Sequence, residues 1–243
     1  MKALILAAGL GTRLKPLTDS KPKALIEVNG HPLLYYAINK LKSSGITDII
    51  INIHHFAGQI KEYIEAGNFG VNISFSDESD ELLDTGGALK KAEWFFAGEN
   101  AFMIYNADVL SSIDLKAMKK FHKEESADVS LACSERKSTR YLLFDKKGQL
   151  GGWQNEKTGE LKPAGLIAEA YKKLAYSGIS ILSPAIIKNT NKKGVFGLTE
   201  LLLEKPVEYK ITAFLHKEKD WMDMGKAESF ENKEKINRLC KLF

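Results

Sequence analysis

The feature of this sequence that most constrains its fold is a repeated alternation of short apolar runs and helical patterns through residues 1–133. The run Asp48–Ile53 is rich in isoleucine, and β-branched residues favour a buried strand. Pro32–Ser44 carries apolar residues at helical spacing, which predicts a helix with one buried face. The other predicted strands are Ala3–Leu6, Val71–Phe75, Ala101–Tyr105 and Asp128–Cys133, and the other predicted helices are Ala57–Ala66, Gly87–Phe96 and Leu115–Glu125. This order predicts an α/β fold with a Rossmann-like, mostly parallel (mixed) sheet sandwiched by helices.

The pattern changes after residue 133, where strand-like segments predominate. Tyr141–Asp145 and Gln149–Trp153 flank Lys146-Lys147-Gly148 and predict a hairpin. The remaining predicted elements are the strands Leu174–Leu182 and Lys210–His216, a loop at Gly159–Gly165 and a final helix from about Lys226 to Leu242. No linker rich in proline or serine divides the chain. We therefore expect one domain, 1–243, rather than two, with the second half adding strands that wall a cleft.

Composition and charge exclude several classes of protein. With 44% hydrophobic residues the chain can bury a sizeable core. The net charge of +4 comes from 35 basic and 31 acidic residues without a basic cluster, so we expect no nucleic-acid partner; small anionic substrates fit this charge equally well. No run of 18 apolar residues occurs, so no membrane partner is expected either. Cys133 and Cys240 match no metal or disulfide spacing, which predicts a cytoplasmic location.

The predicted final helix leaves the oligomeric state open. Its apolar residues can pack on the domain itself or on a second subunit, and they are Phe230, Ile236, Leu239 and Leu242. The chain is therefore expected to be a monomer or a homodimer.

A glycine-rich turn follows the first predicted strand and reads Leu6-Ala7-Ala8-Gly9-Leu10-Gly11-Thr12-Arg13-Leu14. The dinucleotide fingerprint requires glycine where Leu14 stands, and the phosphate-binding P-loop requires Gly-Lys before its hydroxyl residue, so neither pattern matches. Small residues nevertheless let backbone N–H groups approach a phosphate, and Arg13, Lys21 and Lys23 follow closely. The plainer alternative is a tight strand–helix turn with exposed basic side chains.

At these residues the sequence resembles a known family. The pattern L-A-A-G-x-G-T-R-L followed by P-K-x-L, here Pro22-Lys23-Ala24-Leu25, resembles the opening of the sugar-1-phosphate nucleotidyltransferases. The resemblance implies a GT-A-like fold with a nucleotide-binding half (1–133), an added β-rich sugar-binding half (134–225) and a C-terminal helix (226–243). It implies catalytic roles for Arg13, which clamps the leaving pyrophosphate, and for Lys23, which holds the phosphates. It assigns nucleotide binding to Ala7, Ala8, Gly9, Gly11 and Thr12.

Two aspartates complete the predicted reaction centre. Asp108 follows the predicted strand Ala101–Tyr105, and Asp223 lies in Trp221-Met222-Asp223-Met224-Gly225. Each aspartate alone could simply cap a turn. Mg²⁺ prefers carboxylates together with substrate oxygens, and the resemblance implies that these two residues are Mg²⁺ ligands. The implied reaction is a direct in-line attack of a sugar 1-phosphate on the α-phosphorus of a nucleoside triphosphate, without a covalent enzyme intermediate.

The predicted base and sugar pockets rest on shorter motifs. Leu83-Asp84-Thr85-Gly86-Gly87-Ala88, in which Thr85 could cap a helix, resembles the E-T-G-G stretch of the N-acetylmuramate 1-phosphate uridylyltransferase branch. The resemblance places Gly86 and Gly87 near the base, with Asp77 or Glu78 as further candidates. Tyr176-Ser177-Gly178-Ile179 resembles a segment that contacts the sugar. The predicted sugar-binding residues are Asn106, Gly152, Ser177, Gly178 and Glu200.

Two departures from the family pattern concern the sugar. Ala107 stands where many members have glycine, and Glu160-Leu161-Lys162-Pro163 only approximates the common E-K-P segment. The expected function is Mg²⁺-dependent transfer of a nucleoside monophosphate, favouring UTP, to a sugar 1-phosphate, with N-acetylmuramate 1-phosphate as the best single candidate. The alternatives are a guanylyl- or cytidylyltransferase for mannose, heptose or glucose 1-phosphate or for choline phosphate, and a non-catalytic nucleotide-sugar sensor.

Overall fold

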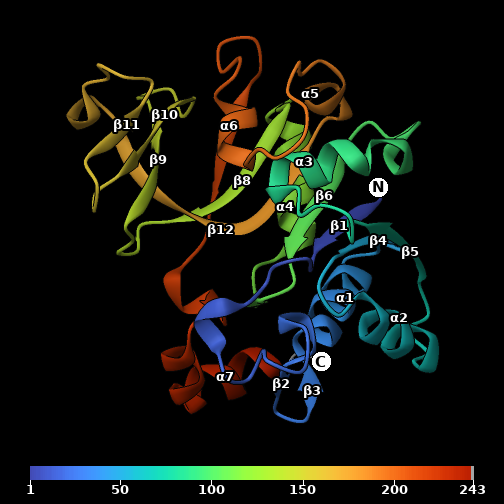
Figure 1. Ribbon diagram of the computed structural model, residues 1–243. Helices are drawn as coiled ribbons and strands as arrows, with labels where there is room; N and C mark the ends of the chain where they lie inside the picture. Colours follow the sequence, from blue (N-terminus) through green and yellow to red (C-terminus); the bar gives the residue numbers. More distant parts are fainter. Residues whose placement is uncertain (242–243) are drawn as a thin grey trace.

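The computed structural model describes residues 1–241, and its centre is a mixed ten-stranded sheet (Figure 1). The main path of the sheet runs β11-β10-β9-β12-β6-β1-β4-β5, and β8 and β13 join it through β12. The parallel part comprises β1 (Ala3–Leu6), β4 (Asp48–Ile53), β5 (Asn72–Asp77) and β6 (Phe102–Asn106). The predicted α/β fold with a mostly parallel, mixed sheet is therefore confirmed.

Helices cover both faces of the sheet, because neighbouring strand residues point to opposite sides. Ile5 of β1 lies in a core cluster with residues of α1 (Leu33–Ser43), α2 (Ala57–Ala66) and α4 (Leu115–Glu124). Leu4 lies in a second cluster with residues of α3 (Asp84–Lys91), α5 (Pro184–Lys188) and α6 (Leu198–Leu202). Figure 1 shows α1 and α2 below the sheet and α3, α5 and α6 above it.

The antiparallel extension is built around β12 (Lys172–Leu182), the longest strand. Its carboxyl-terminal part pairs with β6 and with β8 (Val129–Ser134), whereas its amino-terminal part pairs with β9 (Arg140–Phe144). The predicted hairpin is formed by β9 and β10 (Leu150–Asn155). The expected loop at Gly159–Gly165 contains a short strand instead, β11 (Glu160–Lys162), because it adds to the edge of β10.

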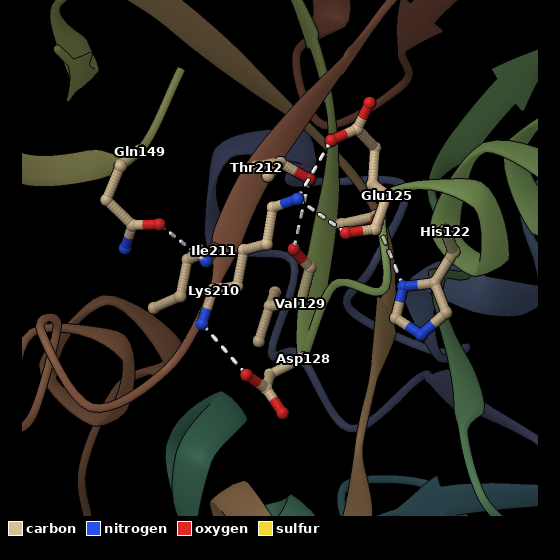
Figure 2. A network of polar contacts seen from close by, with 9 residues as sticks. His122, Glu125, Asp128, Val129, Gln149, Lys210, Ile211 and Thr212 are labelled. Carbon is tan, nitrogen blue, oxygen red and sulfur yellow. Dashed lines mark hydrogen bonds and ion pairs between the residues drawn. The ribbon is translucent and has the colours of Figure 1, made fainter. Parts of the chain in front are cut away.

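Strand β13 (Ile211–Leu215) pairs in parallel with β8. The segment just before β13 is hydrogen-bonded to the β9–β10 hairpin. The side chain of Gln149 accepts from the Ile211 N–H at 3.1 Å and donates to the carbonyl oxygens of Pro206 and Tyr209, both at 2.9 Å. Figure 2 shows Gln149 on one side of this strand, with Lys210 bonded to Asp128 and Glu125. The Gln149 bonds thus join the hairpin turn to the segment before β13, and the Lys210 bonds join that segment to the end of α4 and the start of β8.

The smaller elements complete the description. Two-stranded pairs are formed by β2 (Glu27–Val28) with β3 (His31–Pro32), and by β7 (Val109–Ser111) with β14 (Trp221–Asp223). Single 3₁₀ turns cover Thr12–Leu14, Lys23–Leu25, Glu93–Phe96, Ala168–Ala170, Glu218–Asp220 and Ala227–Glu231. No helix within residues 1–241 combines the length and the apolar character needed to cross a bilayer.

The predicted final helix is wrong in its extent. The segment forms the 3₁₀ turn Ala227–Glu231 and then α7 (Lys233–Cys240), because the Asn232 side chain accepts from the Lys235 N–H at 3.1 Å and starts a new helix. Ile236 and Leu239 are buried against residues of this same chain, including Leu14 and Met224. Leu242 lies outside the described residues. The expected helix Gly87–Phe96 is likewise divided, into α3 and the 3₁₀ turn Glu93–Phe96.

Candidate active site

Two connected chambers open at the carboxyl ends of β1 and β6, where ligands bind in open α/β sheets. The larger chamber has a volume of about 1220 Å³ and the smaller one about 390 Å³. Four residues line both chambers, namely Leu6, Asp84, Thr85 and Asn106. The two cavities therefore form one continuous cleft with two compartments.

The glycine-rich turn forms a wall of the smaller chamber through Ala7, Ala8 and Gly9. The N–H groups of Ala7 and Ala8 both donate to the Asn52 side-chain oxygen, at 2.6 and 3.3 Å. The N–H groups of Gly9, Leu10 and Gly11 donate to no other group in the described chain. The N–H groups of the turn that are open to a phosphate are therefore those of its second part, and the anion nest itself stays a prediction.

Gly11 adopts a left-handed conformation with φ +64° and precedes the 3₁₀ turn that contains Thr12 and Arg13. This conformation favours glycine, because other residues meet a steric penalty there. The Thr18 hydroxyl donates to the Gly11 carbonyl at 3.0 Å. These contacts hold Arg13 at the larger chamber.

A buried hydrogen-bonded chain supports the wall of the smaller chamber. The Asn52 amide donates to one Glu78 carboxyl oxygen at 2.9 Å, and the Leu83 N–H donates to the other at 3.2 Å. Glu78 is fully buried, and burial raises the pKa of its carboxyl, against the lowering effect of these two hydrogen bonds. Glu78 thus lies at the chamber as a desolvated acid that also anchors Asn52.

The four predicted reaction-centre residues converge at one corner of the cleft. A Cβ placed on Gly225 would lie 2.7 Å from Asp223 Oδ1, 2.8 Å from Lys23 Nζ and 3.1 Å from Arg13 Nη2. Lys23 also forms an ion pair with Asp108. Asp108 faces the smaller chamber and Asp223 the larger one, so this corner lies between the two compartments.

Strand pairing explains why the two aspartates meet. In the β7–β14 pair, Asp223 is opposite Val109, the residue that follows Asp108. The two carboxylates and the oxygens of a bound phosphate would suit Mg²⁺, which needs few protein ligands. No cluster of three histidine, cysteine or acidic residues suited to a metal occurs among residues 1–241.

The sugar-binding motif of β12 lies at a β-bulge. The pairing of β12 with β8 shifts register between Tyr176 and Ser180, and Gly178 has φ +73° within this interval. A Cβ on Gly178 would lie 2.8 Å from Asn106 Nδ2, so glycine lets Asn106 lie over the bulge. Asn106 lines both chambers, and its contact with a sugar stays a prediction.

Gly178 and the three remaining predicted sugar-binding residues are not part of the lining of either chamber. Ser177 is fully buried, and its hydroxyl is 2.8 Å from His216 Nε2. A Cβ on Gly152 would lie 2.7 Å from the Lys162 carbonyl oxygen, so Gly152 serves packing within the β10–β11 pair. Glu200 is exposed and lies 3.6 Å from Lys192. Direct sugar contact by these residues stays a prediction.

The Thr-Gly-Gly motif joins two distant segments. Thr85 lies inside α3 and does not cap it; its hydroxyl accepts from the Leu198 N–H at 2.7 Å. The N–H groups of Gly86 and Gly87 donate to the Phe196 carbonyl at 2.9 and 3.1 Å. Side chains at both glycines would collide, with the Phe196 ring and with the Gly194 carbonyl. The glycines therefore let the 194–198 loop pack on α3, where Val195 reaches the smaller chamber. Neither glycine lines a chamber, and their contact with a base stays a prediction.

Several site residues were missing from the predicted set. Asn52 is a polar residue near the end of the Ile-rich run Asp48–Ile53, and this polar position in a buried strand could have indicated a site residue. Gly225 follows Asp223 within a quoted motif, but nothing local indicates that three charged groups surround it. Arg136 lines the larger chamber from the loop after β8, in a region where the sequence carries no recognisable motif.

Comparison with known proteins agrees with this geometry. A family model described as nucleotidyl transferase matches residues 2–237. The chain belongs to the nucleotidyl transferase family. This membership confirms the resemblance to the nucleotidyltransferase family that the sequence motifs indicated.

The curated relatives of this chain differ in the base and the sugar that their names give. A UTP–glucose-1-phosphate uridylyltransferase of Synechocystis is 30% identical over 95% of this chain and 61% of its own length. A mannose-1-phosphate guanyltransferase of Candida glabrata is 32% identical over 95% of this chain and 63% of its own. An N-acetylmuramate alpha-1-phosphate uridylyltransferase of Neisseria meningitidis is 42% identical over 48% of this chain and 51% of its own. The chain thus spans about half to three fifths of the length of these relatives.

Solved structures share the fold of this chain. A Bacillus anthracis protein in complex with sucrose superimposes with a TM-score of 0.81 at 21% identity, covering 98% of this chain and 95% of the other. HddC of Yersinia pseudotuberculosis, complexed with GMP-PN, gives a TM-score of 0.74 at 23% identity, with 98% of both chains covered. These likenesses confirm the mixed α/β sheet with its antiparallel extension.

Proposed function

We propose that this protein transfers a nucleoside monophosphate from a nucleoside triphosphate to a sugar 1-phosphate, releasing pyrophosphate and forming a nucleoside diphosphate sugar. The observation that carries the proposal is the convergence of Arg13, Lys23 and Asp223 around Gly225, with Asp108 bound to Lys23, at the junction of two chambers. Two cations and two carboxylates at such a junction suit an in-line displacement between two anionic substrates.

The two chambers support a division of the substrates between them. The smaller chamber is lined largely by apolar side chains and by the glycine-rich turn, so we assign it to the nucleotide base and ribose. The larger chamber, which Arg13 and Asp223 line, receives the triphosphate tail and the acceptor. The division of the chain into a nucleotide half, residues 1–133, and a sugar half, residues 134–225, stays a prediction, since both halves contribute residues to each chamber.

The proposed chemistry needs no enzyme nucleophile. An oxygen of the acceptor phosphate attacks the α-phosphorus, and the bond from the α-phosphorus to the bridging oxygen of pyrophosphate breaks. Arg13 and Lys23 hold the phosphates and offset the negative charge that develops on them. Asp108 and Asp223 would hold Mg²⁺, which would supply positive charge to offset that of the α-phosphate oxygens.

UTP and N-acetylmuramate 1-phosphate are the substrates we propose first. The proposal is supported by the 42% identity to the Neisseria meningitidis N-acetylmuramate alpha-1-phosphate uridylyltransferase, although that match covers 48% of this chain. A guanylyltransferase acting on another sugar phosphate is the second candidate, which the Candida glabrata relative favours. The free thiols of Cys133 and Cys240 fit the expected cytoplasmic location.

One experiment tests the reaction and its substrates together. Pyrophosphate release is measured with Mg²⁺ over a grid of UTP, dTTP, GTP, CTP and ATP against sugar 1-phosphates and choline phosphate. We expect the strongest turnover for UTP with N-acetylmuramate 1-phosphate. Turnover with GTP and mannose 1-phosphate would favour the second candidate. Nucleotide-dependent thermal stabilisation without turnover anywhere in the grid would contradict the catalytic proposal and indicate a sensor.

A further inference from the structure

Arg136 extends from the loop after β8 into the larger chamber and has no carboxylate partner in the described chain. Its guanidinium lies 3.9 Å from the centroid of the Trp221 ring, and its Nη2 donates to the Tyr176 carbonyl at 2.6 Å. Its Nε is buried without an acceptor. A desolvated cation with unused N–H donors is costly unless an anion completes it.

The Trp221 ring, on which the Arg136 guanidinium lies, is itself held by a hydrogen bond. The Trp221 indole N–H donates to the Ser177 carbonyl at 2.7 Å, which fixes the ring on which the guanidinium lies. Planar stacking of arginine on an aromatic ring leaves the edge of the guanidinium open for hydrogen bonds to an oxyanion. The side chain is therefore held in place before any ligand arrives.

Arg136 lines the same chamber as Asp223 of the proposed reaction centre. Trp221 and Asp223 are two residues apart on β14, so their side chains lie on the same face of that strand. Burial lowers the pKa of Arg136, and among the neighbouring charges Asp223 opposes this effect most strongly. Arg136, Trp221 and Asp223 all line the larger chamber, and none of them lines the smaller one.

Several other cationic side chains in this region are less suited than Arg136 to bind the phosphate of the acceptor. Lys162, from the segment that approximates E-K-P, pairs with Glu160 at 3.3 Å and lies 5.4 Å from the Trp153 ring centroid. It does not line the larger chamber. Lys137, Arg140 and Lys226 line the chamber but are exposed, so they lack the fixed geometry of Arg136.

We propose that Arg136 binds the phosphate of the acceptor sugar and holds its attacking oxygen beside Asp223. The inference rests on the proposed function, because it names the residue that positions the second substrate of that reaction. An acidic acceptor also carries a carboxylate, which offers the same oxyanion chemistry, and the test separates the two groups.

The test compares Arg136→Gln and Arg136→Lys with Lys147→Gln, which removes one positive charge from the exposed hairpin turn. Acceptor KM and nucleotide KM are measured separately with N-acetylmuramate 1-phosphate and with N-acetylglucosamine 1-phosphate, which lacks the carboxylate. We expect Arg136→Gln to raise the KM of both acceptors at least about tenfold and to change the nucleotide KM less than about twofold. Arg136→Lys is expected to restore part of the loss, and Lys147→Gln to match the wild type.

Three results would overturn the assignment. These are an unchanged acceptor KM, an equal rise in the nucleotide KM, and a rise confined to the acceptor that carries a carboxylate. Circular dichroism and melting temperature report folding, and Arg136→Lys carries the test should Arg136→Gln not fold. If the wild type transfers to no acceptor, the proposed function fails. The binding role of Arg136 is then tested separately, by measuring the rise in melting temperature that the same sugar 1-phosphates cause. Loss of this rise in Arg136→Gln would support the role, and an unchanged rise would contradict it.

Discussion

The main-chain N–H of Met224 donates to the carbonyl oxygen of Asp108 at 2.8 Å, although the two residues lie far apart in the sequence. This bond extends the antiparallel pairing of β7 and β14 by one step. It brings Asp223 next to Asp108, and thereby joins the carboxylate of the smaller chamber to that of the larger one. The reaction centre therefore depends on the register of a two-stranded sheet.

The first prediction concerns these two carboxylates. Asp108→Asn and Asp223→Asn remove negative charges that we propose as Mg²⁺ ligands, while preserving size and hydrogen-bonding shape. Each change is expected to lower kcat at least about 100-fold, a typical loss for an electrostatic group at a reaction centre. Asp48→Asn, at the opposite end of β4, is the matched control. Near-wild-type turnover of both site variants at saturating Mg²⁺ would contradict the proposed roles.

The second prediction concerns Gly225. Its backbone permits alanine, since φ lies outside the left-handed region, but the new methyl group would displace the Asp223 carboxylate and the Lys23 ammonium. Because misplacement of reacting groups by about 1 Å can cost about 100-fold, Gly225→Ala is expected to lower kcat by 10- to 100-fold, as an order of magnitude. Gly58→Ala, where a methyl group meets open space, is expected to leave kcat unchanged. Equal turnover of the two variants would refute the crowding argument.

The third prediction concerns Thr85 and the loop that it holds. Thr85→Val keeps the shape of the side chain but removes the oxygen that accepts from the Leu198 N–H. The free energy of unfolding is expected to fall by about 1–3 kcal/mol, the cost of an unsatisfied polar group. The nucleotide KM is expected to rise, because Val195 on the same loop lines the smaller chamber. Thr85→Ser keeps the hydroxyl and should restore both values in urea unfolding and kinetics.

The fourth prediction concerns the pH dependence of stability. The folded chain raises the pKa of Glu78 by burial, so between the unfolded and folded pKa values the native state binds more protons than the unfolded state. The contribution of Glu78 to the free energy of unfolding is therefore fully present below its ordinary pKa of 4.5. This contribution is lost as pH rises through the raised pKa.

Glu78→Gln does not titrate, so it isolates this contribution. The stability advantage of the wild type over the variant is expected to shrink between about pH 5 and about pH 8. Urea unfolding at both pH values, with Glu81→Gln as the exposed control, measures the difference. A constant advantage at both pH values would show that Glu78 does not titrate in this range in the folded protein.

Motifs near the start of the chain could be read directly from the sequence. Arg13 and Lys23 lie within a short, dense pattern, and the structure brings both to the same point as Asp223. The roles of the Thr-Gly-Gly motif could not be predicted in this way. The partner of Gly86 and Gly87 is the 194–198 loop, which is more than a hundred residues away in sequence and whose own composition indicates only a turn.

By itself the sequence determined the order and type of most strands and helices, because periodicity and β-branched content are local properties. It also indicated four charged residues of the site, namely Arg13, Lys23, Asp108 and Asp223, but not Arg136. Only the tertiary structure decided how the site is arranged. The β7–β14 register brings Asp223 next to Asp108, the bulge in β12 places Asn106 over Gly178, and Arg136 stacks on Trp221. These depend on packing between segments that meet only in the folded chain, where burial and close contact select one register among several that local patterns permit.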